Sequence, residues 1–246
     1  MIVICNHIPD VWFNLAAEEY LLKNFREDIF MLWRSEPSVV MGKYQDAAAE
    51  INLEFARREG IKVARRFSGG GTVYHDKGNF NLSFIRNGGL AASDSCTGEI
   101  VAFLRKTGVA AYSDERRGIY VDGLKISGSA QALHRQRSLH HATLLFSSDL
   151  DVVETVLSPP SGQTAGEPPE KGKGKGYYVK SVKSPVTNLS GHLPGSVSMK
   201  NFRDLLLGYF AGPDTKALRY ELSEKDIRGI MNLRDEKYAS LEWIFR

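Results

Sequence analysis

The sequence contains little cysteine: Cys5 and Cys96 are the only two among 246 residues. Two cysteines so far apart form neither a metal-ligand spacing nor a disulfide framework, which favours a reducing compartment over secretion. No apolar run reaches the length of a membrane span, and Asn6, His7 and Pro9 interrupt the apolar start that a signal peptide would need. We therefore expect a cytoplasmic protein without a membrane segment.

A strong excess of charge of one sign is also missing. The chain has 32 Lys and Arg against 29 Asp and Glu, a net charge of +3 and a pI near 8.7. This excess is too small to indicate nucleic acid, and no nucleic-acid motif is visible, but it can help to attract an acidic protein substrate. A hydrophobic content of 42% in 246 residues is typical of a globular body, and we expect one domain over residues 1–246.

The most informative segment is the run RRFSGGGTVYHDKGNFN at residues 65–81. It lacks the terminal Gly-Lys-Ser/Thr of a phosphate loop, and it does not open a helix as a dinucleotide fingerprint does. Three consecutive glycines allow positive φ and bring bare backbone amides close to a ligand, while Arg65 and Arg66 add planar donor forks. A simple tight turn is the alternative. The density of polar residues around the glycines favours an anion-binding site.

Hydrophobic periodicity predicts strands and helices that interleave without a strict β-α-β rhythm. Strands are expected at 2–5, 29–34, 38–42, 61–66, 72–75, 81–86 and 140–146. Helices are expected at 14–25, 52–59, 95–107, 151–157, 198–210 and 223–233. Residues 117–130 read as a hairpin in which Asp122-Gly123 fits a type I′ turn. The pattern predicts an α+β fold with a mixed, largely antiparallel sheet and flanking helices.

The run RRFSGGGTVYHDKGNFNLSF resembles the signature of lipoate-protein ligases and their lipoyltransferase relatives. Four further segments resemble motifs of this family in the family's order: WFNLAAEE at 12–19, LKISGSA at 124–130, HHATLL at 140–145 and VTNL at 186–189. Together the five segments cover most of the chain. The resemblance implies the catalytic-domain fold that biotin and lipoate ligases share, although the glycine-arginine-glycine loop of biotin ligases is missing.

By this resemblance, Lys125 is the catalytic residue, and it also contacts the nucleotide. Its position in an apolar hairpin is unusual for a lysine, and a fixed ammonium there would stabilise negative charge on a transferring phosphate. Residues implied for the acyl substrate are Arg66, Ser68, Gly69, Gly70, Gly71, His75 and His141. Residues implied for the nucleotide are Thr72, Val73 and Asn79. Neither His75 nor His141 belongs to a ligand cluster, so zinc is not expected.

The implied function is a ligase that activates lipoate with ATP to lipoyl-adenylate and transfers the lipoyl group to a lysine of a lipoyl domain. ATP and Mg²⁺ would be substrates, and the acceptors would be E2 subunits of 2-oxoacid dehydrogenases or the glycine-cleavage H protein. One alternative is a lipoyl or octanoyl transferase that uses an activated acyl donor; its cysteine-dependent form is disfavoured because neither cysteine lies in a pocket motif. Another is a non-catalytic protein that binds lipoate or lipoyl domains.

The chain departs from the family pattern at two places. An Asn-Asp pair is expected shortly before the lysine, but Arg117-Gly118 stands there, so the metal site is unknown and Asp114, Glu115 or Asp122 would have to substitute. The chain also ends about where many bacterial ligases begin an accessory domain, which a separate chain could supply. In addition, residues 159–176 are rich in Pro, Gly and Lys, and we expect a mobile loop, in part a lid over the ligand.

Overall fold

The computed structural model describes residues 1–160, 178–212 and 219–246. A five-stranded sheet lies at its centre, with the strand order β1-β2-β6-β11-β10. Its strands are β1 (Ile2–Asn6), β2 (Ile29–Trp33), β6 (Asn79–Asn87), β10 (Ser129–His134) and β11 (Arg137–Leu145). The pair β1 and β2 is parallel, and the other three pairs are antiparallel. The predicted mixed, largely antiparallel sheet is confirmed.

Two small sheets adjoin one end of the central sheet. The first has the order β4-β3-β5, built from β3 (Ser38–Met41), β4 (Lys62–Arg65) and β5 (Val73–His75). The second has the order β7-β8-β9, built from β7 (Tyr112–Ser113), β8 (Ile119–Val121) and β9 (Leu124–Ser127). In the turn between β8 and β9, φ is 50° at Asp122 and 80° at Gly123, as the predicted type I′ turn requires.

Capping side chains begin most of the long helices. Asp10, Asp149, Ser198 and Ser223 accept hydrogen bonds from backbone amides of the first turn. The α-helices are α1 (Val11–Asn24), α2 (Ala47–Glu50), α3 (Leu53–Arg58), α4 (Gly89–Lys106), α5 (Leu150–Val156), α6 (Met199–Ala211), α7 (Glu224–Leu233) and α8 (Leu241–Ile244). A 3-10 turn, η1 (Leu189–His192), precedes α6, and a π-helical turn, η2 (Arg234–Tyr238), continues α7.

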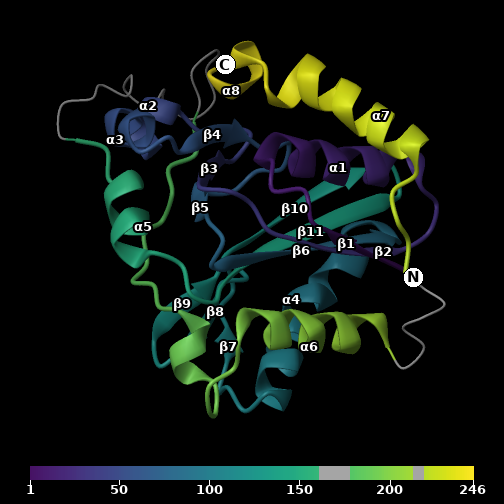
Figure 1. Cartoon of the computed structure of the whole chain (residues 1–246), viewed down its shortest axis with the longest axis vertical. Coiled ribbons are helices and arrows are strands. Elements are labelled where there is room, and N and C mark those ends of the chain that lie inside the picture. The colour runs from purple at the N-terminus through teal and green to yellow at the C-terminus, as the bar shows by residue number, and fades with distance from the viewer. Residues whose placement is uncertain (161–177, 213–218) are drawn as a thin grey trace.

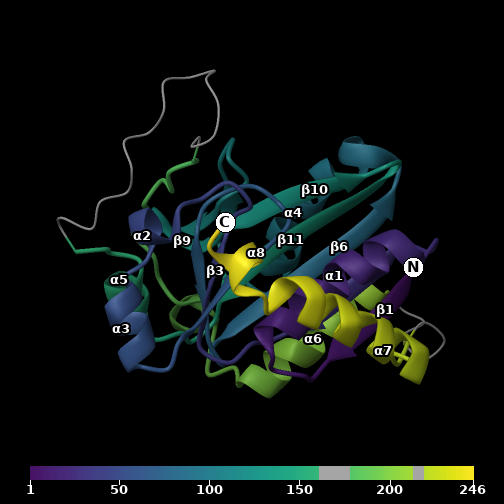
Figure 2. The ribbon, with the colours of Figure 1, turned by 90° about the horizontal axis from the view of Figure 1, so that it is seen from above.

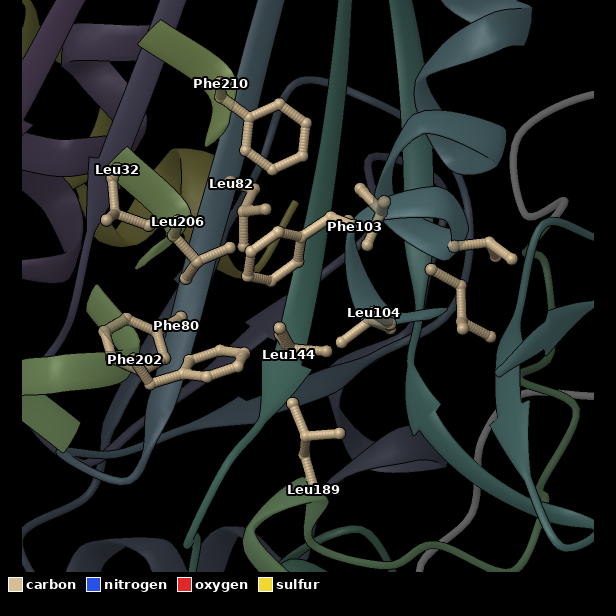
Figure 3. Close-up of a cluster of buried hydrophobic side chains, with 14 of the residues drawn as sticks. Leu32, Phe80, Leu82, Phe103, Leu104, Leu144, Leu189, Phe202, Leu206 and Phe210 are labelled. Atoms are coloured by element: carbon tan, nitrogen blue, oxygen red, sulfur yellow. The ribbon is translucent and has the colours of Figure 1, made fainter. Parts of the chain in front are cut away.

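The helices cover both faces of the central sheet. Figure 1 shows α1 and α7 on one side of it and α4 and α6 on the other, and Figure 2 shows α2, α3 and α5 together at the end where the small sheets lie. Phenylalanine and leucine side chains of β2, β6, β11, α4 and α6 form the largest buried cluster (Figure 3). A second cluster lies under α1 and a third under α2, α3 and α5. These rigid layers position the strand ends that build the site.

Most predicted elements are present, with shifted ends. Helix α4 begins six residues before the predicted 95, at the pair Gly88-Gly89, and β10 is a separate strand in the central sheet although residues 117–130 were expected to form one hairpin. Nearly all of the predicted loop at 159–176 lies outside the described residues. Within the part of the chain that the structure describes, no helix combines the length and apolar character needed to cross a membrane.

Candidate active site

The glycine loop connects β4 with β5 and lies against the loop that follows β3. Gly70 has φ of 88°, and a Cβ added to Gly42 would lie 2.0 Å from the Gly70 carbonyl oxygen. The Lys43 amide donates to the Ser68 carbonyl across the same contact. Only residues without a side chain allow two backbone segments to approach this closely. The glycines therefore do more than make a turn: they fix the loop as one wall of a site.

Arg66 organises this loop from within the protein. Its buried guanidinium donates to the carbonyl oxygens of Gly69, Gly71 and Val40 at 2.6 to 3.2 Å and to Ser68 Oγ at 3.0 Å. Burial lowers its pKa to about 10, opposed by the nearby Glu18 carboxylate, so the guanidinium stays charged at neutral pH. Four of the five N–H groups of this guanidinium donate to protein oxygens, and one on Nη1 does not. Arg66 therefore shapes the glycine loop more than it offers donors to a ligand.

A buried polar relay continues from Arg66 across the central sheet. Ser68 Oγ lies 2.7 Å from His141 Nε2, and His141 Nδ1 lies 2.8 Å from Glu18 Oε2. The other Glu18 oxygen accepts from Ser83 Oγ, which accepts from Trp33 Nε1. Because a carboxylate accepts, Nδ1 of His141 donates to Glu18, and in the neutral ring Nε2 then accepts from the Ser68 hydroxyl. These hydrogen bonds thus fix the orientation of the His141 and Trp33 rings at the cavity wall.

A small cavity of about 310 Å³ lies between the glycine loop and the central sheet. Trp33, His75 and His141 contribute to its wall, together with Gly70, Ala130 and apolar side chains. Both ring nitrogens of His75 are buried without a hydrogen-bond partner among the described residues. Burial lowers the pKa of His75 to about 3, with repulsion from Arg66 and His141 adding to it. The wall of the small cavity thus contains a neutral ring whose two nitrogens are buried and unpaired among the described residues.

A larger cavity of about 1010 Å³ opens next to the small one, and Lys125 lies in the wall of both. Thr72, Val73 and Thr143 also line both spaces, while Glu50, Asp151 and Glu154 line only the larger. Burial lowers the pKa of Lys125, Asp114 opposes this shift, and Arg116 adds to it. Volumes of several hundred Å³ hold cofactors and small substrates. Lys125 is therefore placed where two ligands would meet.

The segment 179–186 contributes to the walls of both cavities. The Ser181 hydroxyl accepts from the Thr72 amide at 2.8 Å and from Gln45 Nε2 at 2.8 Å, and its own amide donates to Glu50. Val179 and Lys180 line the small cavity beside it, and Val186 pairs with Lys125 in a parallel bridge. The Thr72 amide, which the sequence predicted to contact the nucleotide, thus donates to the Ser181 hydroxyl in this structure.

The structure brings together most of the residues that the sequence predicted for the site. Lys125, Arg66, Gly70, Gly71, Thr72, Val73, His75 and His141 line one or both cavities. Ser68 and Gly69 lie one layer behind, where both bind Arg66. Asn79 lies in neither wall; it is fully buried, and its amide donates to Asn81. A contact between Asn79 and a nucleotide therefore stays a prediction without geometric support.

Glu18, Ser83, Thr143 and Ser181 are among the side chains of the site that sequence reasoning missed. Glu18 is completely buried on α1 and holds His141. A glutamate within the apolar surface LAAEEYLL was a visible signal, because an unpaired buried carboxylate is costly and implies a partner. The other three are single hydroxyls in ordinary surroundings, for which the sequence offers no signal.

Adding a side chain at Gly70 is expected to block the small cavity. A Cβ there would lie 3.0 Å from the Arg66 guanidinium, and a β-branched residue does not suit φ of 88°. We expect Gly70→Val to weaken lipoate binding by about fivefold or more, since strain of this kind costs about 1–3 kcal/mol. Gly69→Ala is the matched control, because its Cβ would meet nothing within 4 Å. Isothermal titration with lipoate measures both; equal affinities would contradict the steric account.

Comparison with known proteins agrees with this geometry. Residues 10–211 match the model of the lipoyl protein ligase A/B catalytic domain. Lipoate-protein ligase 1 of Staphylococcus aureus is 36% identical over 97% of this chain and 71% of its own length. LplJ, a lipoate-protein ligase of Bacillus subtilis, is 35% identical over 96% of this chain and 71% of its own length.

Solved structures show the same fold. Protein Ta0514 of T. acidophilum with bound lipoic acid gives a TM-score of 0.80 at 25% identity, covering 99% of this chain and 98% of its own. Lipoate-protein ligase A bound with ATP gives a TM-score of 0.79 at 26% identity with the same coverage. The resemblance seen in the sequence is confirmed. The chain therefore belongs to the lipoyl protein ligase A/B catalytic-domain family, which is a family of enzymes.

Proposed function

We propose that this chain activates lipoate with ATP to form lipoyl-adenylate and then transfers the lipoyl group to a lysine of a lipoyl domain. The observation that carries the proposal is the position of Lys125 in the wall shared by a small and a larger cavity. The small, mostly apolar cavity suits the acyl chain, and the larger one suits the nucleotide. Relatives solved with lipoic acid and with ATP support this assignment.

In the first step, a lipoate carboxylate oxygen attacks the α-phosphorus of ATP, and the bond to the leaving pyrophosphate breaks. Negative charge gathers on the α-phosphate oxygens at this point, next to the Lys125 ammonium. A cation held in a partly buried wall stabilises that charge more in the transition state than in the ground state. In the second step, the amine of the acceptor lysine attacks the acyl carbon, and AMP leaves.

Mg²⁺ is part of the proposal as a companion of ATP. Among the described residues, no group of three or more His, Cys, Asp or Glu could hold a metal ion. Arg117-Gly118 replaces the expected carboxylate, and Asp114 already accepts from the amides of Arg116 and Gly118 and from the Tyr120 hydroxyl. Mg²⁺ often binds through only one or two carboxylates and the substrate phosphates. Because the described residues offer no carboxylate cluster, the phosphates of ATP would be its main ligands here.

The structure disfavours the cysteine-dependent transferase. Cys96 is buried in α4, Cys5 lies in the edge strand β1, and neither lines the small or the larger cavity. Burial raises the pKa of both thiols, that of Cys96 to about 12, so neither supplies a thiolate at neutral pH. A transferase that takes lipoyl-adenylate directly remains the second candidate, because Arg117-Gly118 stands where the family has Asn-Asp.

E2 lipoyl domains are the acceptors we propose first, since a T. acidophilum relative was solved as a bipartite ligase with its E2 lipoyl domain. The H protein, a separate accessory chain and a cytoplasmic location remain predictions from the sequence. The deciding measurement is lipoate-dependent exchange between ATP and pyrophosphate with Mg²⁺, repeated with lipoyl-adenylate and an apo lipoyl domain. Exchange is expected. Transfer from the adenylate without exchange would identify the transferase, and binding without either reaction would identify a non-catalytic protein.

A further inference from the structure

The short loop before β8 carries a carboxylate that the proposed mechanism does not use. Asp114 Oδ1 accepts from the amides of Arg116 at 3.0 Å and Gly118 at 2.7 Å, and its Oδ2 accepts from the Tyr120 hydroxyl at 2.9 Å. These three bonds lower the pKa of Asp114 against the desolvation that would raise it, with Lys125 adding to the effect. The carboxylate is therefore fixed in place and charged, although it lies at the surface.

Tyr120 connects Asp114 to the catalytic hairpin. Tyr120 and Lys125 are directly opposite each other in the antiparallel pair β8 and β9, so their side chains leave the same face of the sheet. The Tyr120 ring is stacked on Tyr112, with ring centroids 5.7 Å apart and planes 21° apart, which limits its movement. The hydroxyl of a clamped ring thus holds the Asp114 carboxylate on the face from which Lys125 projects.

Gly118 leaves the room that this arrangement needs. A Cβ at Gly118 would lie 2.9 Å from Tyr120 Cε2, 3.0 Å from the Tyr120 oxygen and 3.2 Å from Asp114 Oδ1. The space of a side chain at position 118 is thus occupied by the ring and the carboxylate. Any larger residue at position 118 would displace the Tyr120 ring and the Asp114 carboxylate, so the position of Asp114 depends on Gly118.

We infer that Asp114 is a positioning residue: its charge, held by Tyr120 on the face of the hairpin from which Lys125 projects, keeps the Lys125 ammonium available for the phosphate of the nucleotide. Two effects lower the pKa of Lys125: its burial and the charge of Arg116, which also lines the small cavity. Both disfavour the ammonium, and Asp114 opposes them. The inference rests on the proposed function, because it assumes that Lys125 carries the chemistry.

Other charged groups face the same space. Glu50 of α2, Asp151 and Glu154 of α5, and Lys180 and Lys183 of the segment after residue 177 line the larger cavity. Burial and the charge of Arg116 lower the pKa of Lys125, and the carboxylate that opposes them is Asp114. Asp114 is therefore the carboxylate whose removal is expected to change the charge of Lys125.

Competitive labelling of Lys125 with acetic anhydride, read by mass spectrometry across pH 7 to 11, tests this without any substrate. Because only the neutral amine reacts, Asp114→Asn is expected to move the labelling midpoint to lower pH, while Asp114→Glu stays near wild type. Asp122→Asn is the matched control, an exposed aspartate of the same hairpin paired with His192. An unchanged midpoint in Asp114→Asn, or an equal shift in the control, would overturn the inference.

The pH profile of ATP–pyrophosphate exchange gives a second reading. The ammonium is the active form, so losing Asp114 removes activity at high pH first, and we expect the ratio of exchange at pH 9 to exchange at pH 7 to be lower in Asp114→Asn than in wild type. Tyr120→Phe keeps the two amide bonds to Asp114 and is expected to shift the labelling midpoint less, in the same direction; no shift would argue against the Tyr120 link. Absent exchange in wild type counts against the proposed function alone, since labelling decides the role of Asp114.

Discussion

Lys125→Ala is expected to slow lipoate-dependent ATP–pyrophosphate exchange by about 10²- to 10³-fold, the usual effect of removing one fixed charge-stabilising group from an active site. Lys125 lies in the wall shared by both cavities, and it is the lysine that the hairpin directs towards the point where acid and nucleotide would meet. Steady-state exchange kinetics at saturating lipoate and ATP measure the loss. Transfer from prepared lipoyl-adenylate, measured in parallel, shows whether Lys125 also serves the second step.

Lys125→Arg is the informative control. It keeps the positive charge but replaces a compact ammonium with a planar fork, so partial activity is expected. Lipoate binding by Lys125→Ala should change little, because the apolar walls of the small cavity are intact. Exchange within threefold of wild type in the alanine variant would remove Lys125 from the chemistry and would leave the shared wall as a binding feature only.

The hairpin that carries Lys125 shows why parts of the site were predictable from the sequence. Asp-Gly at 122–123 encodes a turn with two positive φ values through local chemistry alone, and the structure has it. Ser223 likewise begins α7 with a capping box to Asp226, three residues later. Such signals lie within a few residues of each other, so one sequence suffices to detect them.

Contacts between distant segments could not be predicted in this way. The hairpin expected at 117–130 is interrupted at Gly128, where the chain leaves the sheet of β8 and enters the central sheet. Glu18 and His141 are 123 positions apart and meet only because α1 packs on the face of β11 that His141 occupies. Nothing local in the polar segment around Ser181 shows that its hydroxyl binds the Thr72 amide.

The second large effect is expected at Arg66, where Arg66→Met should destabilise the fold by about 3–5 kcal/mol. The side chain is buried, and its loss leaves the carbonyls of Val40, Gly69 and Gly71 without their donors. A buried acceptor without a partner costs about 1–3 kcal/mol, and partial relaxation of the loop limits the sum. Urea unfolding followed by circular dichroism measures the change. Lipoate affinity should fall with it, because the same carbonyls shape the cavity wall.

Arg65→Met separates the loss of stability from the loss of the site. Arg65 is as deeply buried as its neighbour, but it donates to the carbonyls of Trp243 and Ile244 in α8 and to those of Gly42 and Gln45. Arg65→Met should therefore destabilise the fold to a similar degree as Arg66→Met. Its lipoate affinity, measured at a temperature where both variants are folded, should stay closer to wild type. Equal loss of affinity in both variants would mean that the glycine loop depends on general stability. A loss confined to Arg66→Met would show that this one guanidinium sets the shape of the anion site.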